Sequence, residues 1–179
     1  MPTLNHEYFM QQALKEAQAA FDADEVPVGA VVVMNNQIIA RAHNQVELLN
    51  DSTAHAEILA LTSAYSSLGA KYLPEATLYV TVEPCIMCCG AIYWGKIGSI
   101  VYGASDEKNG YRHLTKEQWP FHPKTELIAG ILEADCAFLK TLSIPKVVSN
   151  LSSISSESPS YAKANWFLRS LKRLLTGVA

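Results

Sequence analysis

The sequence predicts an α/β fold in which helices cover both faces of one central sheet. Short segments rich in β-branched and aromatic residues alternate along the chain with longer amphipathic segments. Strands that are separated by helices need crossover connections, and these connections cover both faces of a sheet. The 179 residues include 49% hydrophobic and 17% charged residues, a composition typical of a globular protein that buries its own core.

The first part of the chain is predicted to contain a helix, a hairpin and a second helix. Apolar residues recur at helical spacing from Met10 to Phe21, and Pro27 interrupts this pattern. Asn35-Asn36 lies between two apolar segments and is typical of a tight hairpin turn. The expected elements are a helix over residues 5–22, strands over 28–33 and 37–42, and a helix over 53–67.

The second part is predicted to contain three strands and two helices. Pro84 directly follows an apolar segment and favours the start of a helix there. The expected elements are strands over residues 77–82, 99–103 and 126–129, and helices over 84–94 and 132–141. Strand-to-helix turns of this kind are the usual location of ligand sites in open α/β sheets.

Residues 1–145 are expected to form one domain, and the composition changes after it. Seven serines occur between residues 149 and 160, so we expect a flexible linker over 146–160. Residues 161–179 regain helical periodicity and are expected to form a basic amphipathic helix. Three interpretations of this tail stay open: a helix docked on the domain, an RNA-binding appendage, and a helix at a membrane surface.

The charge is distributed unevenly along the chain. Residues 1–150 contain 10 Lys and Arg against 16 Asp and Glu, whereas residues 151–179 contain four against one. The basic excess of the tail favours an anionic partner, although it also serves solubility. No run of eighteen apolar residues and no signal-peptide pattern occurs, so we expect a cytoplasmic protein that does not insert into membranes.

Two short motifs carry the chemistry expected of this chain. His55-Ala56-Glu57 and Pro84-Cys85-Ile86-Met87-Cys88 lie about thirty residues apart. His55, Cys85 and Cys88 supply three ligands for zinc, and a catalytic zinc leaves its fourth position to water. Glu57 is not needed as a ligand and can reach that water. The spacing matches the pattern of zinc-dependent nucleobase deaminases.

Each residue type in the motifs has a chemical reason. Zinc lowers the pKa of a bound water to about 7, which provides a nucleophile at neutral pH. Hydrolytic deamination also needs a proton on the ring nitrogen and another on the leaving amino group. Glu57 can accept the proton of the water and pass it on, which is general acid–base catalysis.

Other interpretations of the cysteines are possible. Cys85 and Cys88 could form a redox dithiol, as in thioredoxin-like proteins, or half of a structural zinc site that needs a fourth ligand. Cys89 points elsewhere on a helix, and Cys136 is distant in sequence. We expect both of these residues to behave as small buried hydrophobic side chains.

Several motifs closely resemble those of bacterial tRNA-specific adenosine deaminases, which belong to the cytidine-deaminase-like superfamily. The resemblance covers roughly residues 5–142 and is carried by residues 25–30, Asn44, residues 53–58 and residues 77–85. It implies a three-layer α/β/α sandwich around a five-stranded mixed sheet, one zinc per chain and a homodimer. The implied reaction converts the wobble adenosine in the anticodon loop of tRNA to inosine.

The same resemblance assigns roles to individual residues. His55, Cys85 and Cys88 match the zinc ligands, and Glu57 matches the residue that transfers protons. The positions matched to substrate binding are Asn44, which bonds the base, Val28 in the base pocket, Ala56, and Asp106, which contacts the neighbouring ribose. The amide of Asn44 offers both a donor and an acceptor to a base edge, although a turn residue after a strand is the other interpretation.

The substrate has an alternative. Residues 90–94 resemble guanine deaminases of the same superfamily, and residues 107–114 differ from the small-residue stretch typical of the tRNA enzymes. A guanine, cytosine or nucleoside deaminase that acts on a small free substrate is therefore the alternative function. A zinc-binding module without catalysis is a third possibility, and the presence of Glu57 disfavours it.

Overall fold

The computed structural model describes residues 5–116 and 118–142, and its five strands form one mixed sheet. The predicted linker over 146–160 and the predicted tail over 161–179 lie outside the described residues. No helix within the described ranges is long and apolar enough to cross a membrane.

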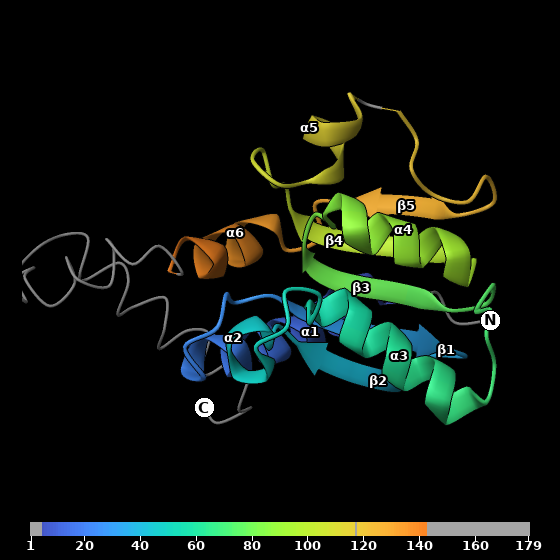
Figure 1. Cartoon of the computed structure of the whole chain (residues 1–179), viewed down its shortest axis with the longest axis horizontal. Helices are drawn as coiled ribbons and strands as arrows, with labels where there is room; N and C mark the ends of the chain where they lie inside the picture. The colour runs from blue at the N-terminus through green and yellow to red at the C-terminus, as the bar shows by residue number, and fades with distance from the viewer. Residues whose placement is uncertain (1–4, 117, 143–179) are drawn as a thin grey trace, which may run out of the picture. The chain divides into compact units, whose positions relative to one another are not determined.

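The directions of the strands bring the carboxyl ends of four of them to the same edge of the sheet (Figure 1). The sheet order is β2-β1-β3-β4-β5, with β1 antiparallel to both of its neighbours and with β3, β4 and β5 mutually parallel. Consequently β2, β3, β4 and β5 all end at one edge, and β1 begins there. The strands are β1 (Gly29–Met34), β2 (Gln37–His43), β3 (Thr77–Val82), β4 (Ser99–Ala104) and β5 (Glu126–Ala129).

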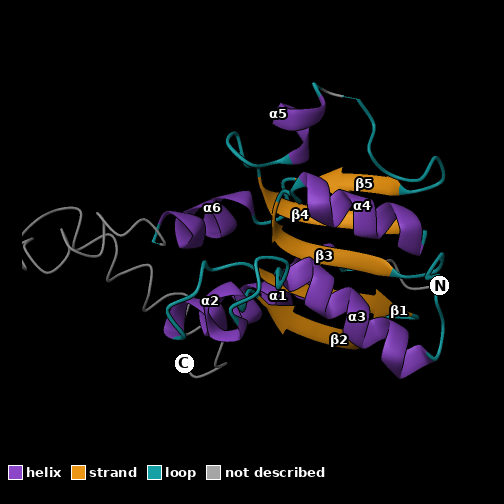
Figure 2. Cartoon of the chain, viewed as in Figure 1, coloured by secondary structure: helices purple, strands orange, loops and turns teal. Residues whose placement is uncertain are grey.

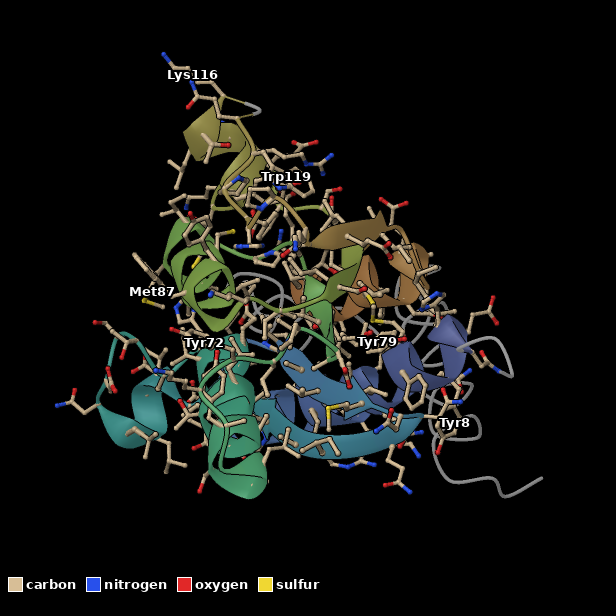
Figure 3. All side chains as sticks on the ribbon, turned by 90° about the vertical axis from the view of Figure 1, so that its right-hand side faces the viewer. Tyr8, Tyr72, Tyr79, Met87, Lys116 and Trp119 are labelled. Atoms are coloured by element: carbon tan, nitrogen blue, oxygen red, sulfur yellow. The ribbon has the colours of Figure 1, made fainter. Side chains whose placement is uncertain are left out.

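Helices cover both faces of the sheet (Figure 2). One face carries α3 (Ala56–Leu68) and α4 (Ile86–Gly95), and the other carries α1 (His6–Asp22) and α6 (Glu133–Thr141). Figure 3 looks along the strands and shows the teal and green helices on one side and the blue and brown helices on the other. Two short helices, α2 (Val46–Leu49) and α5 (Tyr111–Thr115), lie in the connections. The α/β/α sandwich predicted from the sequence is confirmed.

The central strand β3 shows why two layers of helices are needed. All six of its residues are buried, as expected for a strand whose two faces are both covered. Leu78 and Val80 belong to the hydrophobic cluster shared with α3 and α4. The ring of Tyr79 lies 5.2 Å from the ring of Phe9 in α1, and its hydroxyl is 3.0 Å from Nδ1 of His6.

Helix α1 packs directly against the backbone of β1 because Gly29 has no side chain. A Cβ atom at this position would overlap the carbonyl oxygen of Ala13 and the amide nitrogen of Ala17. The amide of Gly29 also donates a hydrogen bond to the hydroxyl of Thr81, with 3.2 Å between the atoms. The glycine therefore sets the distance between the helix and the sheet.

The hairpin between β1 and β2 uses the turn predicted from its asparagines. Asn35 and Asn36 have φ angles of 54° and 61°. Positive φ at both central positions is typical of a type I′ turn, whose twist matches that of the flanking strands. This turn lies at the edge of the sheet where β1 ends.

The main differences from the sequence prediction concern where helices begin. Helix α3 begins at Ala56 and α4 begins at Ile86, two to three residues later than predicted, with His55 and Cys85 as the N-cap residues. The short helices α2 and α5 were not predicted, because four and five residues are too few for a periodic pattern.

Replacement of Gly29 with alanine is expected to lower the free energy of unfolding by about 3 kcal/mol, because the new methyl group meets helix backbone that cannot rotate away. Urea denaturation followed by circular dichroism measures this change. Gly69→Ala is the matched control, because Gly69 has a φ of 59° but no atom within 4 Å of an added Cβ. Backbone strain alone should cost about 1–2 kcal/mol there. Equal losses in the two variants would contradict the proposed role of Gly29.

Candidate active site

Three possible metal ligands meet at the edge of the sheet where β2, β3 and β4 end. His55 is the N-cap of α3, Cys85 is the N-cap of α4, and Cys88 lies in the first turn of α4. Both helices begin at this edge and run back across the same face, so their first residues are neighbours (Figure 1). The fold thus brings together residues that are about thirty positions apart in sequence.

The distances among these three residues fit a tetrahedral metal site. The Cys85 and Cys88 sulfur atoms are 3.6 Å apart, and each lies 3.6 Å from Nδ1 of His55. Ligands of a tetrahedral zinc, at about 2.3 Å for sulfur and about 2.0–2.1 Å for nitrogen, lie roughly 3.5–3.8 Å from one another. Within the described ranges this is the one group of His, Cys, Asp and Glu residues arranged to hold an ion. The donor set therefore fits zinc in composition and in spacing.

Hydrogen bonds within this group favour a thiolate at Cys85. The thiol of Cys88 and the ring of His55 both bond to the Cys85 sulfur and lower the pKa of Cys85 to about 4. The same bond and burial raise the pKa of Cys88, and the bond from Cys85 raises that of His55. A thiolate is the form of cysteine that binds metals.

Glu57 is buried beside these ligands and is not one of them. It lies in the first turn of α3, and 4% of its surface is exposed. Burial raises the pKa of its carboxyl group. A buried carboxyl group with a raised pKa is a candidate for accepting and releasing a proton during a reaction.

A cavity of about 520 Å³ opens next to these residues. Its volume is in the range of pockets that hold small ligands such as a nucleobase. Three residues assigned to substrate binding from the sequence line it, namely Val28, Asn44 and Asp106. Ala56 does not line it, because its fully buried side chain belongs to the core cluster under α3.

Asn44 is held in the cavity wall by Glu25. Both side chains are buried, with exposed fractions of 5% and 4%. The amide nitrogen of Asn44 donates to the carboxylate of Glu25 at 2.9 Å. Glu25 belongs to the motif Glu25–Ala30, but its contact with Asn44 spans nineteen residues and could not be seen in the sequence.

Asp106 shapes the loop that follows β4. Its carboxylate accepts hydrogen bonds from the amides of Lys108 and Asn109, and lies 3.1 Å from Nζ of Lys140. Burial opposes ionisation, but these bonds prevail and lower the pKa of Asp106. The residue therefore stabilises its own turn and presents negative charge at the cavity.

A second glutamate missed in the sequence, Glu83, fixes this loop to the turn between β3 and α4. Its buried carboxylate accepts from the amides of Asp106 and Arg112 and from two nitrogens of the Arg112 guanidinium, all at 3.0–3.1 Å. The amide of Tyr111 also donates to the carbonyl of Pro84 at 2.9 Å. The loop is thus attached beside Cys85.

The two remaining cysteines are buried away from the ligand group, as predicted. Cys89 faces the carbonyl oxygen of Pro84 at 3.9 Å, and burial raises its pKa beyond the ordinary range of a thiol. Cys136 packs against Gly103, where a Cβ would overlap its sulfur. Both residues pack as small hydrophobic side chains.

Comparisons with known proteins agree with this geometry. Residues 4–154 match the model of the MafB19-like deaminase family. The chain is 45% identical over 134 residues to a tRNA-specific adenosine deaminase of Bacillus subtilis, which covers 73% of the chain and 83% of that relative. A solved structure from a study of tRNA:A34 deaminases that edit the wobble position matches with a TM-score of 0.69 and 41% identity, over 74% of this chain and 98% of that one. The guanine deaminase of Nitrosomonas europaea matches with a TM-score of 0.63 and 27% identity, over 76% and 84%.

Replacement of Arg112 with alanine is expected to lower the free energy of unfolding by about 1–3 kcal/mol, because buried Glu83 loses two of its four donors. Urea denaturation measures the loss, and faster hydrogen exchange at the amides of Asp106 and Arg112 locates it. Arg112→Lys keeps the charge but cannot form both bonds, so it should fall between alanine and the wild type. An alanine variant with wild-type stability and exchange would show that the loop is held by other contacts.

Proposed function

Because the chain belongs to the family of the tRNA-specific adenosine deaminases, we propose that it converts the adenosine at the wobble position of a tRNA anticodon to inosine. The observation that carries the chemistry is the arrangement of three ligands and one buried carboxyl group beside a single cavity. The observation that carries the substrate is the 45% identity to the Bacillus subtilis enzyme, which extends over most of both chains.

His55, Cys85 and Cys88 would hold one zinc ion in this mechanism, since their spacing and donor atoms fit it. Zinc, when bound, supplies an activated water for attack on the carbon that carries the amino group. Cys85 is the N-cap of α4 and Cys88 lies in its first turn, where the helix dipole stabilises a thiolate.

Glu57 would transfer the protons. It accepts a proton from the attacking water and delivers it to the ring nitrogen next to the reacting carbon. It then accepts the proton of the new hydroxyl group on that carbon and delivers it to the amino group, which leaves as ammonia while the carbonyl of inosine forms. Burial, which raises the pKa of Glu57, supports this cycle, because the carboxyl group must hold the proton between two transfers.

The cavity wall would bind the base and its sugar. We assign the base edge to Asn44 and one face of the base to Val28, both of which line the cavity. Asp106 would face the ribose of the neighbouring nucleotide. Ala56 would act through its backbone N–H, because the first amides of a helix have no partner within the helix and its side chain is in the core.

The guanine deaminases provide the second candidate function. Similarity to the Nitrosomonas europaea enzyme favours it, as does the acidic character of residues 1–150, which is less suited to RNA than to a small base. A base extruded from a single-stranded loop and a free base would meet the same ligands and the same Glu57.

One assay separates the two functions. Unfractionated tRNA is incubated with the zinc-loaded protein, digested to nucleosides and analysed for inosine by mass spectrometry. Parallel reactions contain free guanine, adenosine, cytosine or cytidine and are followed by ammonia release. We expect inosine to appear in the tRNA digest and no turnover of the free compounds. Turnover of guanine without inosine in tRNA would establish the second function instead.

The metal assignment is tested by removing single sulfur ligands. Cys85→Ala and Cys88→Ala are each expected to lose zinc and activity, because two protein ligands hold the ion far less tightly than three. Elemental analysis of purified protein measures about one zinc per chain in the wild type. Cys89→Ala is the control, since this buried thiol is outside the ligand group and should keep its zinc. Full zinc in both ligand variants would refute the assignment.

Replacement of Glu57 should abolish turnover without loss of metal. Glu57→Gln keeps the shape of the side chain but cannot cycle a proton, and Glu57→Ala removes the group entirely. Both are expected to reduce kcat by at least about 10²–10⁴-fold, the usual contribution of general acid–base catalysis. Zinc content and circular dichroism should match the wild type. Near-normal deamination by a folded, zinc-loaded variant would exclude Glu57 as the proton carrier.

We also propose that the protein is a cytoplasmic homodimer. Reduced thiol ligands are stable in the cytoplasm. The exposed aromatic residue Trp94 on α4, with 74% of its surface accessible, supports an interface on the face of α3 and α4.

Light scattering at micromolar concentration should give twice the chain mass of 19.6 kDa for the wild type. Trp94→Glu should give the single-chain mass, because a charge would be buried in the interface. Trp119→Glu is the control, because this residue is half-exposed on a different segment. A wild-type mass near 20 kDa would exclude the dimer.

A further inference from the structure

We propose that Glu25 is a positioning residue that fixes which edge of the Asn44 amide faces the substrate. The inference rests on the proposed function, because it concerns the residue assigned there to the base edge. Glu25 follows α1 and lies in the cavity wall, where 4% of its surface is exposed. It would act on the substrate through Asn44.

The two oxygens of the Glu25 carboxylate each meet an N–H group. One accepts from the side-chain amide nitrogen of Asn44 at 2.9 Å, and the other accepts from the backbone amide of Leu48 at 2.8 Å. The carboxylate therefore joins a residue at the end of β2 to helix α2. Each bond has the length of a charge-assisted hydrogen bond, which is stronger than one between neutral groups.

These contacts decide whether the oxygen or the nitrogen of the Asn44 side-chain amide points toward Glu25. An asparagine amide has almost the same shape when it is rotated by 180°, so its orientation depends on its hydrogen-bond partners. The reversed orientation would place the Asn44 oxygen against the Glu25 oxygen, where two acceptors repel each other. In the observed orientation the Asn44 oxygen makes no hydrogen bond with any of the described residues. The cavity therefore receives an acceptor oxygen together with the second amide hydrogen.

A fixed acceptor at the wall matters for recognition of a base. Each base edge presents a defined pattern of hydrogen-bond donors and acceptors. If the cavity wall offers a donor where the base also has a donor, or an acceptor where it has an acceptor, both groups stay unpaired and binding is weakened. Glu25 thus selects between two patterns that Asn44 alone could present equally well. This makes it a determinant of base specificity that acts through Asn44.

Glu25 also has a structural contact that the experiment must separate from this role. Its bond to Leu48 attaches α2, and Val46 and Glu47 of this helix line the cavity. A purely structural role would act through the shape of the wall. A positioning role acts through the Asn44 side chain, so it must disappear when that side chain is absent.

The variant Glu25→Gln tests the inference. Glutamine offers only one acceptor oxygen to the N–H groups of Asn44 and Leu48. Its own NH₂ group would face the other N–H donor, or the Asn44 amide would have to rotate by 180°. We expect kcat/KM of the zinc-loaded full chain with tRNA to fall about 10- to 100-fold, the loss typical of one hydrogen bond to a charged group. Zinc content should stay unchanged. The matched control Glu16→Gln removes a carboxylate of α1 that pairs with Arg41 and His43 and does not line the cavity, and it should retain wild-type kcat/KM.

A double-mutant cycle separates positioning from structure. In the Asn44→Ala background, Glu25→Gln should change kcat/KM less than about twofold, because the side chain that it positions is already missing. The same 10- to 100-fold loss in both backgrounds would overturn the inference and assign Glu25 to the wall alone. Unchanged kcat/KM for Glu25→Gln in the wild-type background would also overturn it.

A spectroscopic measurement decides the orientation without any substrate. In the ¹⁵N-labelled, zinc-loaded protein, the side-chain amide of Asn44 should show one hydrogen-bonded proton with slow solvent exchange. Glu25→Gln should shift this signal and accelerate its exchange, whereas Glu16→Gln should leave it in place. An Asn44 signal unaffected by Glu25→Gln would refute the positioning role. If the wild type deaminates none of the tested substrates, the proposed function fails, and this measurement still decides the orientation.

Discussion

The common direction of β2, β3 and β4 is the constraint on which the rest of the site depends. Because β1 runs against its neighbours, the hairpin returns β2 to the same edge at which β3 and β4 end. The residues after these three strands, Asn44, Glu83 and Asp106, therefore face one cavity. The first residues of α3 and α4 complete it from the same face of the sheet. A reversal of any one of these three strands would move its following residue away from this cavity.

Three buried glutamates surround this cavity, and their surroundings give them different uses. The carboxylates of Glu25 and Glu83 accept two and four hydrogen bonds from N–H groups, and these bonds hold neighbouring segments. Although burial opposes it, bonds from Arg112 and two backbone amides lower the pKa of Glu83. Burial instead dominates at Glu57 and raises its pKa. Two of the three glutamates therefore hold neighbouring segments through N–H donors, whereas at Glu57 burial outweighs the hydrogen bonds that it accepts.

The parts of the structure that depend on local pattern could be predicted from the sequence. The five strands, the four longer helices and the Asn35-Asn36 turn follow from periodicity and turn chemistry, and the ligand group follows from two short motifs. Contacts between distant segments could not be predicted this way. The pairing of Glu25 with Asn44 and of Glu83 with Arg112 depends on how the loops fold over the sheet edge. The position of the Ala56 side chain could not be predicted either, since the rotation of α3 about its axis turns this methyl group into the core.

The type I′ turn at Asn35 and Asn36 has a practical consequence for work with this protein. It is exposed and lies where β1 ends, at the opposite edge of the sheet from the cavity. Exposed loop tips of this kind tolerate insertions well, since little buried backbone is disturbed. A fluorescent label, an affinity peptide or a surface linker can therefore be attached there. The labelled or immobilised protein would then keep its cavity intact, because the attachment point lies at the opposite edge of the sheet.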